Sequence, residues 1–289
     1  MRGLKKQHIF FSIFAPSLKH RNKMKYSEIE RIINMLKFNT FLFILMISVF
    51  LAASCTKHEK GIVEIIFTHT VDNMPVQFNQ LIYINAAGTQ YQVNEIKYFI
   101  SRIFFIDAEG KSIEIKQNDG IHYVDCSLKN TLRWEIDEIP PRDYTAISFV
   151  FGLDENDNIS NRFVNPPECN FSWPDYLGGG YHYMQINGKF LNKEGNIQNM
   201  NIHTGIGQLY DENHEVTQFV HNHFTVSLPV VFSVHSDNTT SLTLNMEIQR
   251  WFGAPNLYDF NEFGSGIMQN QKAQEMLKMN GVGVFNVKK

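Results

Sequence analysis

Cysteine is scarce in this sequence, and what is missing excludes several classes of protein. Three cysteines occur in 289 residues, at Cys55, Cys126 and Cys169, and no two of them form a CxxC pair. A thioredoxin-type redox site and a zinc ribbon are therefore not expected. Basic charge is not in excess either, because 26 Lys and Arg face 29 Asp and Glu. Without a positive surface to meet phosphates, nucleic acid is not an expected partner.

The signature sequences of common enzymes are also missing. The chain has no GxSxG elbow, no HExxH and no P-loop. The three glycines at 178–180 lack both the GxGxxG spacing and the Lys-Ser/Thr that follows in a phosphate loop. We therefore expect a binding protein and not an enzyme. A weaker alternative is a water activated by a metal on histidines, near an acid such as Asp175.

The longest apolar run covers residues 41–54. It fits the hydrophobic region of a secretory signal and is short for a transmembrane helix. It ends in Leu51-Ala-Ala-Ser-Cys55, which resembles a bacterial lipobox and makes Cys55 the expected site of lipid attachment. An ordinary signal peptide, or a signal anchor with an incidental cysteine, is the alternative. If Cys55 carries lipid, Cys126 and Cys169 remain, either as a disulfide or as two thiols.

The residues before this run suggest that translation starts later than Met1. A signal peptide that begins at Met35 has a normal length, whereas one that begins at Met1 is far too long. The start is expected at Met35 or Met24, and residues 1–54 are set aside from the fold. Residues 55–60 are a predicted polar tether. From Cys55 onward 17 basic residues face 27 acidic ones, so a basic leader precedes an acidic body, as in exported proteins.

The body, residues 61–289, is predicted to be a single all-β domain. Hydrophobic residues make up 43% of the chain and include 24 Phe, so a large core is expected. Pro229 lies inside one apolar run and predicts an edge strand or a bulge there. Alternating or β-branched runs between polar turns predict strands at 61–69, 112–116, 122–126, 146–151, 226–234 and 241–248. This spacing is typical of an antiparallel β-sandwich.

Helix is expected mainly near the C-terminus. Residues 266–279 carry apolar side chains near helical spacing, and Gly281 follows as a stop signal. Residues 93–100 fit the helical and the strand period alike, so a short second helix stays open there.

Histidines supply the candidate metal ligands. His182 and Met184 share one face of a predicted strand, and His203 follows 21 residues after His182, a natural separation for neighbouring strands. His221 and His223, at i and i+2, would face the same side of a strand. Imidazole with a thioether favours copper, and zinc is the alternative because it also binds imidazoles. The competing interpretation is structural: His182 and His203 only form hydrogen bonds, Met184 packs in the core, and His221 and His223 are exposed and bind nothing.

Several short motifs, taken in order, resemble the MbnP-like family. They span roughly residues 62–287, and their order and spacing carry the resemblance. The family consists of periplasmic copper-binding proteins associated with methanobactin operons, and this chain is most similar to their lipoprotein relatives in Bacteroidetes. The motifs are residues 86–88 with Tyr91, 93–101, 122–125, 139–153, Trp173-Pro with 178–184 and Gly188, His203-Thr-Gly205, and Trp251-Phe with 258–260 and 267–268.

The resemblance implies an all-β sandwich that binds copper in the periplasm. In studied members, histidines hold the copper together with a tryptophan that a dihaem partner of the cytochrome c peroxidase type oxidises to kynurenine. His203 matches the family's His-x-Gly histidine, and Trp173 matches the tryptophan stretch. This chain departs from the pattern, because three glycines and then His182 follow Trp-Pro. His182 and His203 are therefore the expected ligands, with His221 or His223 as the third.

Two functions follow from this. The leading one is a lipoprotein of the outer membrane or periplasm, anchored through Cys55, that captures copper or hands it over. The alternative is an adhesion module that binds a glycan or a protein without metal, through exposed aromatic residues such as Trp251 or Tyr258.

Overall fold

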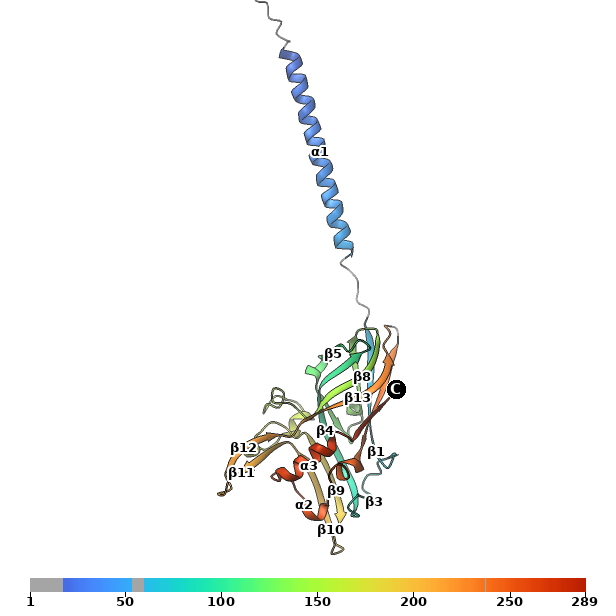
Figure 1. The fold of residues 1–289 in the computed structure, drawn as a ribbon, viewed down its shortest axis with the longest axis vertical. Helices are drawn as coiled ribbons and strands as arrows, with labels where there is room; N and C mark the ends of the chain where they lie inside the picture. Colours follow the sequence, from blue (N-terminus) through green and yellow to red (C-terminus); the bar gives the residue numbers. More distant parts are fainter. Residues whose placement is uncertain (1–17, 54–59, 237) are drawn as a thin grey trace, which may run out of the picture. The chain divides into compact units, whose positions relative to one another are not determined.

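The computed structural model describes residues 18–53, 60–236 and 238–289. The chain divides into two compact units, Met1–His58 and Glu59–Lys289. The first contains helix α1 (Leu18–Ala53) (Figure 1). Among the described residues, no helix is both long and apolar enough to cross a membrane. Cys55, the predicted lipid site, lies outside the described residues.

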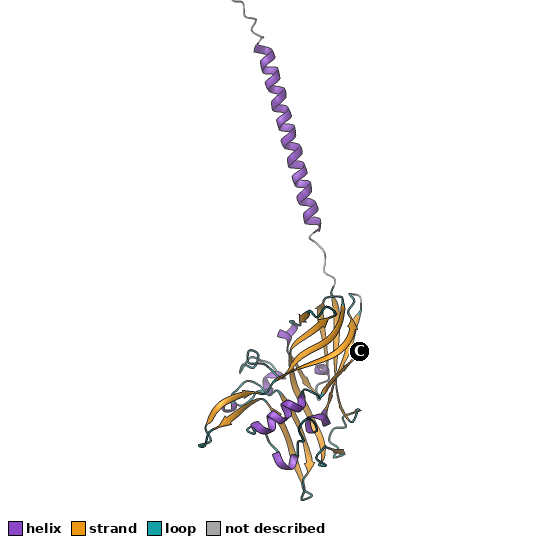
Figure 2. Ribbon diagram, viewed as in Figure 1, coloured by secondary structure: helices purple, strands orange, loops and turns teal. Residues whose placement is uncertain are grey.

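The second unit is built mainly from strands, as Figure 2 shows. Its first eight strands are β1 (Gly61–Val71), β2 (Met74–Pro75), β3 (Tyr83–Ile84), β4 (Gln90–Asp107), β5 (Ser112–Glu114), β6 (His122–Asp125), β7 (Arg133–Ile139) and β8 (Asp143–Phe151). The others are β9 (Met184–Leu191), β10 (Ile197–Thr204), β11 (Ile206–Tyr210), β12 (Val216–His221), β13 (Phe224–Ser233), β14 (Thr239–Glu247) and β15 (Phe285–Lys288). Two α-helices, α2 (Phe260–Phe263) and α3 (Gln271–Gly281), lie near the C-terminus. Single turns of 3-10 helix cover Gln117–Gly120, Lys129–Leu132, Glu168–Phe171, Asp175–Leu177 and Ile248–Phe252. The predicted all-β class with a short C-terminal helix is confirmed.

Two sheets and one separate hairpin organise these strands. The larger sheet has the order β10-β9-β4-β8-β13, and β3, β5 and β6 also pair with β4. The smaller sheet has the order β15-β14-β1-β2, and β7 also pairs with β1. Strands β11 and β12 pair only with each other among the described strands. The pairings between the described strands are antiparallel except for β1 with β14, which are parallel and lie far apart in the sequence, as a parallel pair requires.

Strand β4 corrects the open interpretation of residues 93–100. These residues are strand and not helix, and they pair with β9 and then with β6 and β8. Tyr98, Phe99 and Ile100 are all fully buried, so both faces of the strand are covered. A β-bulge after Val93 places the buried Val93 and Ile96 three residues apart, a spacing that also fits a helix, and only the neighbouring strands resolve the choice.

The six strands predicted from the sequence and the C-terminal helix are confirmed with shifted bounds. The C-terminal helix begins at Gln271, because the side chain of Asn270 accepts a hydrogen bond from the backbone N–H of Ala273 and caps it. Pro229 lies in β13, at the edge of the larger sheet, where the register with β8 shifts between Pro229 and Phe232.

The buried apolar residues form two clusters. The main core packs between the two sheets, and β1 contributes to it at alternate positions, such as Val63, Ile65 and Phe67. The second cluster lies on the opposite face of β4, around Phe99, and is here called the aromatic cluster. It comprises Phe99, Ile121, Tyr123, Leu153, Phe171, Trp173, Leu177, Tyr181, Tyr183 and Ile206. Both clusters fall between residues 63 and 285, so the unit Glu59–Lys289 holds its own core.

The C-terminal aromatic residues belong to the main core. Trp251 is 1% exposed and Tyr258 is fully buried. The interpretation that they form an exposed platform for a glycan or a protein is therefore wrong. Their rings pack against apolar neighbours inside the sandwich, which removes them from contact with a partner.

Candidate metal centre

The glycine-rich turn places His182 beside the aromatic cluster. Gly178, Gly179 and Gly180 all have left-handed backbone, with φ of 111°, 70° and 77°. At Gly180 a Cβ atom would also collide with the side chain of Asn158, so only glycine fits. The backbone N–H of His182 then donates to the carbonyl of Phe171 over 2.9 Å. His182 therefore lies before β9 and not in the strand that the sequence predicted, and this hydrogen bond fixes its backbone.

His203 and Trp173 lie next to His182. Strands β9 and β10 pair, with Gln185 opposite His203 and Met184 opposite Thr204, so His203 lies close to the residues that precede β9. The ring centroids of His182 and His203 are 5.2 Å apart, with an angle of 79° between the planes. The ring of Trp173 is 4.8 Å from that of His182. The structure thus brings together three residues that the sequence singled out.

Gly205 is what lets Trp173 lie so close to this turn. A Cβ atom on Gly205 would stand 2.7 Å from Cε3 of Trp173, well inside van der Waals contact. The indole N–H of Trp173 donates to the carbonyl of Leu177 over 3.2 Å, so the buried ring is also satisfied. The His-x-Gly sequence therefore serves the packing of the tryptophan as well as the placement of His203.

Hydrogen bonds define the tautomers of the two histidines. Nδ1–H of His182 donates to the carbonyl of Phe171 over 3.1 Å, which leaves Nε2 buried, unprotonated and without a partner. The amide of Asn187 donates to Glu95 over 2.8 Å, so its oxygen is free to accept from Nε2–H of His203 over 2.7 Å. Nδ1 of His203 then carries the lone pair. Each ring keeps one unprotonated nitrogen, and its other nitrogen is oriented by a hydrogen bond, as in protein metal sites.

Burial keeps both imidazoles neutral. Burial and, to a smaller extent, the neighbouring His203 together lower the pKa of His182 to about 4. Burial likewise lowers the pKa of His203 to about 4, against the opposing effect of Glu95. Glu95 is itself paired with the ammonium of Lys97 over 2.5 Å. At neutral pH the pair therefore presents two unprotonated donors, the form that binds metals.

His221 and His223 form a different group, together with Glu155. His221 ends β12 and His223 precedes β13, so they do not share a strand as the sequence predicted. Among the described residues, these two histidines and Glu155 make the one set of three His, Cys, Asp or Glu whose ligand atoms lie within 4.8 Å of one another. The sequence does not indicate Glu155 as a partner of these histidines, because it lies far from both of them along the chain.

The remaining candidate ligands have structural surroundings. Met184 is fully buried in the main core. His69 is engaged at both nitrogens, by Cys126 at 3.3 Å and by the hydroxyl of Tyr98 at 3.1 Å. Cys126 and Cys169 are free thiols, so they do not form a disulfide. Burial raises the pKa of the Cys126 thiol to about 12, which keeps it protonated and a poor ligand.

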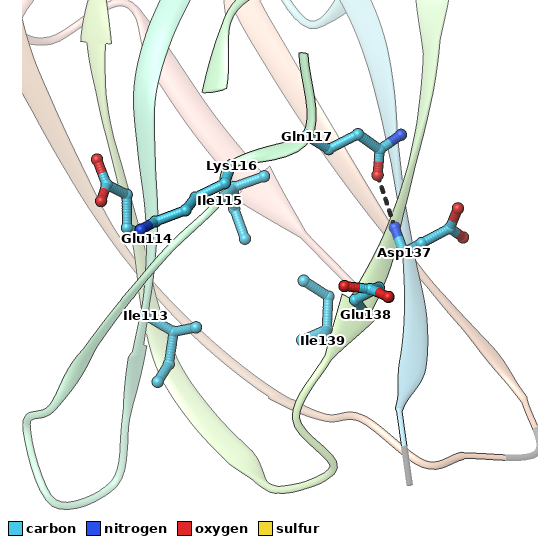
Figure 3. A pocket seen from close by; sticks show the side chains of 8 residues that line it. All are labelled: Ile113, Glu114, Ile115, Lys116, Gln117, Asp137, Glu138 and Ile139. Atoms are coloured by element: carbon cyan, nitrogen blue, oxygen red, sulfur yellow. Dashed lines mark hydrogen bonds between the residues drawn. The ribbon is translucent and has the colours of Figure 1, made fainter. Parts of the chain in front are cut away.

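A groove at the edge of the sandwich lacks such donors. It has a volume of about 590 Å³ and lies between residues 113–117 and 137–139 (Figure 3). Its lining combines isoleucines with charged residues and contains neither histidine nor cysteine. The amide oxygen of Gln117 accepts from the backbone N–H of Asp137 across it, over 2.8 Å. The groove is a gap between strand edges that this glutamine spans.

These features define a class: β-sandwich domains with two neutral histidines, one buried and one half-buried, ordered beside a tryptophan. The chain belongs to the MbnP family, since the sequence profile of that family matches residues 60–270. The solved structure of MbnP from Methylosinus trichosporium is similar, with 13% sequence identity and a TM-score of 0.48, and the match covers 69% of this chain and 80% of that chain. No curated protein sequence matches this chain significantly. The family predicted from the sequence motifs is confirmed.

Proposed function

We propose that this protein binds copper between His182 and His203 and serves to capture or hand over the metal. The observation that carries the proposal is the buried Nε2 of His182, which has no hydrogen-bond partner and lies beside the ring of His203. Such an unsatisfied atom costs about 1–3 kcal/mol in a folded protein. Coordination to a metal would remove that cost. Membership of the MbnP family supports the choice of metal through the resemblance described above.

The donor set favours Cu(I) over zinc. Two neutral imidazoles without a coordinating carboxylate suit a soft ion of low charge and low coordination number, whereas zinc prefers four ligands. Glu95, the carboxylate that acts on His203, is occupied by Lys97 and Asn187. The ring of Trp173 offers a polarisable neighbour to a bound cation. Zinc is the alternative metal, and His221 or His223 is not needed as a third ligand in this proposal.

The site can be tested on the unit Glu59–Lys289, which holds its own core. The metal-free protein is titrated with Cu(I) against a chromophoric chelator, beside the variant His182→Ala/His203→Ala and the matched variant His221→Ala/His223→Ala. We expect the first variant to lose affinity on the order of 100-fold and the second to keep it within about twofold. Equal Cu(I) affinity in the wild type and the first variant would refute the site. Elemental analysis that finds zinc alone would overturn copper.

The proposal includes an anchored location and a redox partner. Lipid on Cys55 would hold the domain at the outer membrane or in the periplasm, where it binds metal without acting as an enzyme. Labelled fatty acid incorporated by the wild type and not by Cys55→Ala would support the anchor. A dihaem partner of the cytochrome c peroxidase type would leave its mark on Trp173, and the mass of the peptide that contains Trp173, taken from the native source, tests this.

A further inference from the structure

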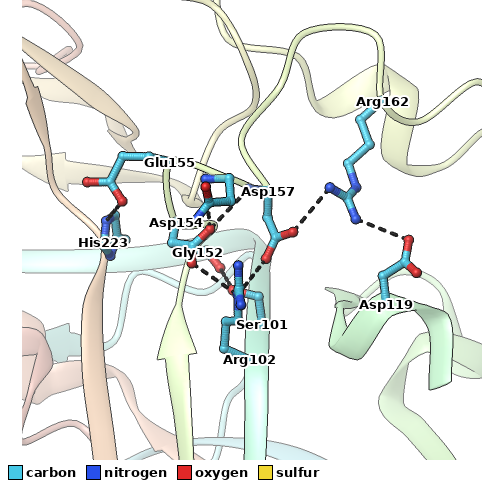
Figure 4. Close-up of polar contacts among 10 residues, drawn as sticks. Ser101, Arg102, Asp119, Gly152, Asp154, Glu155, Asp157, Arg162 and His223 are labelled. Atoms are coloured by element: carbon cyan, nitrogen blue, oxygen red, sulfur yellow. Dashed lines mark hydrogen bonds and ion pairs between the residues drawn. The ribbon is translucent and has the colours of Figure 1, made fainter. Parts of the chain in front are cut away.

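Glu155, His221 and His223 meet at the surface from three parts of the chain. Glu155 lies in the loop after β8, His221 ends β12, and His223 lies just before β13. Nε2 of His223 is 3.3 Å from Oε2 of Glu155, and Nδ1 of His221 is 4.0 Å from Oε1. Figure 4 shows the carboxylate of Glu155 directed at the ring of His223. All three ligand atoms fall within 4.8 Å of one another.

The backbone between the two histidines explains why both rings reach the same carboxylate. Asn222 is 4% exposed, and its amide donates to the carbonyl of Gly205 and to the side chains of Gln271 and Gln274. Lys278 of α3 also donates to the carbonyl of His221, over 2.9 Å. Because Asn222 is anchored inward, the residues on either side of it are held at the surface.

The loop that carries Glu155 is held by arginines. Nε of Arg102 lies 3.0 Å from a carboxylate oxygen of Asp154 and 3.0 Å from one of Asp157. Arg162 pairs with the other oxygen of Asp157 over 3.1 Å (Figure 4). These ion pairs occupy both neighbouring aspartates and leave Glu155 as the acidic side chain of the loop that meets the histidines. The ligand atoms are thus positioned by interactions that do not involve them.

The nitrogens at the centre of the group are unusual for a surface. Nδ1 of His221 and Nε2 of His223 are shielded from solvent, and neither makes a hydrogen bond. They lie against the carboxylate without the alignment of a hydrogen bond. A cation between the three groups would satisfy both nitrogens and the carboxylate together.

The geometry points to a second metal site, formed by Glu155, His221 and His223 and separate from the His182/His203 pair. Two imidazoles and a carboxylate favour a divalent ion of borderline softness, Zn²⁺ or Cu²⁺, and not Cu(I). Donors on a tetrahedral zinc lie about 3.4 Å apart at usual bond lengths, so side-chain movements of about 1 Å would close the site. Glu155 is 55% exposed, which leaves a coordination position open to water or to a ligand atom of a partner.

The experiment is a Zn²⁺ titration of the metal-free unit Glu59–Lys289 against a fluorescent chelator. We compare the wild type with His221→Gln/His223→Gln, with Glu155→Gln, and with the matched control His214→Asn/His235→Gln, which removes two exposed histidines elsewhere. We expect the histidine variant to lose affinity by about 100-fold and Glu155→Gln by about tenfold, while the control stays within about twofold. His182→Ala/His203→Ala should also keep the Zn²⁺ affinity, which separates this site from the proposed copper site.

A second measurement covers the case in which a variant folds poorly. Cu²⁺ bound to the wild type should give an electron paramagnetic resonance spectrum with hyperfine coupling to two imidazole nitrogens, and the histidine variant should lose it. The inference is overturned if the wild type binds no Zn²⁺ at micromolar concentration. It is equally overturned if His182→Ala/His203→Ala abolishes the binding, or if the exposed-histidine control weakens it as much as the site variants do.

Discussion

Two regions of the molecule bring histidines together, the pair His182/His203 and the group Glu155/His221/His223, and the surroundings of their imidazoles differ. The pair lies against the aromatic cluster, with its pKa values lowered and its tautomers defined by a carbonyl and an amide. The group lies at the surface, next to a carboxylate. Desolvation beside a carboxylate that is already paired with Lys97 disfavours a doubly charged ion, whereas an unpaired carboxylate at the surface attracts one. The desolvation of the histidines therefore indicates the preferred metal better than the number of histidines does.

The largest effect should come from the side chain that supports the pair. Trp173→Ala removes a ring that is 2% exposed and packs on His182 and Gly205, so we expect a loss of about 3–5 kcal/mol in the free energy of unfolding. Tyr176→Ala, nearby but 72% exposed, should change it by no more than about 0.5 kcal/mol. Urea denaturation measures both. Similar losses in the two variants would show that the aromatic cluster does not support the pair.

Acid should destabilise the protein through the buried pair. The folded pKa values of His182 and His203 are about 4, below the unfolded value near 6.5, so the unfolded state binds more protons in between. Stability is then lost as the pH falls from 6.5 towards 4, by up to about 3 kcal/mol for each histidine. Denaturation midpoints at several pH values measure this. His182→Leu/His203→Leu should give a shallower pH dependence, and an unchanged slope would contradict the assignment.

A smaller effect is expected from the side chain that orients His203. Asn187→Leu removes the acceptor for Nε2–H of His203, so the tautomer and the ring orientation are no longer defined. We expect a loss of about 10- to 100-fold in Cu(I) affinity, typical of residues that orient metal ligands. The exposed Asn199→Leu on β10 is the control. Zn²⁺ affinity at Glu155, His221 and His223 should not change in either variant.

The smallest effect should be found at the surface group. Arg102→Met frees the loop that carries Glu155 by removing its contacts to Asp154 and Asp157. We expect Zn²⁺ affinity to fall by up to about tenfold and Cu(I) affinity to stay constant. Arg133→Met, which removes an exposed ion pair with Glu64, serves as the control. A parallel fall of both affinities in Arg102→Met would show that the two sites are not independent.

Strand patterns were readable where one face of a strand is buried. β1 alternates between buried and half-buried residues along its whole length, and its sequence shows that period. Residues 93–100 of β4 were ambiguous, because a β-bulge between Val93 and Glu95 interrupts the alternation and both Val93 and Ile96 enter the main core. Two buried residues three positions apart fit a helix as well as a bulged strand, so the choice between helix and strand there depends on partners that are distant in sequence.

The candidate sites, too, could be predicted from the sequence only in part. The chain order of residues 182–203 suggested that two histidines would be neighbours, because consecutive strands often pair. The sequence could not show which nitrogen of each histidine is hydrogen-bonded, because that depends on the carbonyl of Phe171 and the side chain of Asn187. Glu155 could not be foreseen either, because its contact with His223 is made by the path of a loop. Local patterns carry no information about such contacts.

Composition and short-range pattern were sufficient for the all-β class, the C-terminal helix and the choice of candidate histidines, because these depend on neighbours along the chain, and the resemblance of ordered motifs pointed to the family. The burial of Trp251 and Tyr258, the lowered pKa values of His182 and His203, and the grouping of His221 and His223 with Glu155 came only from the folded molecule. Desolvation and ligand geometry are properties of groups brought together from distant positions. For that reason the proposed difference in metal preference between the two sites rests on the three-dimensional arrangement and not on the residues taken singly.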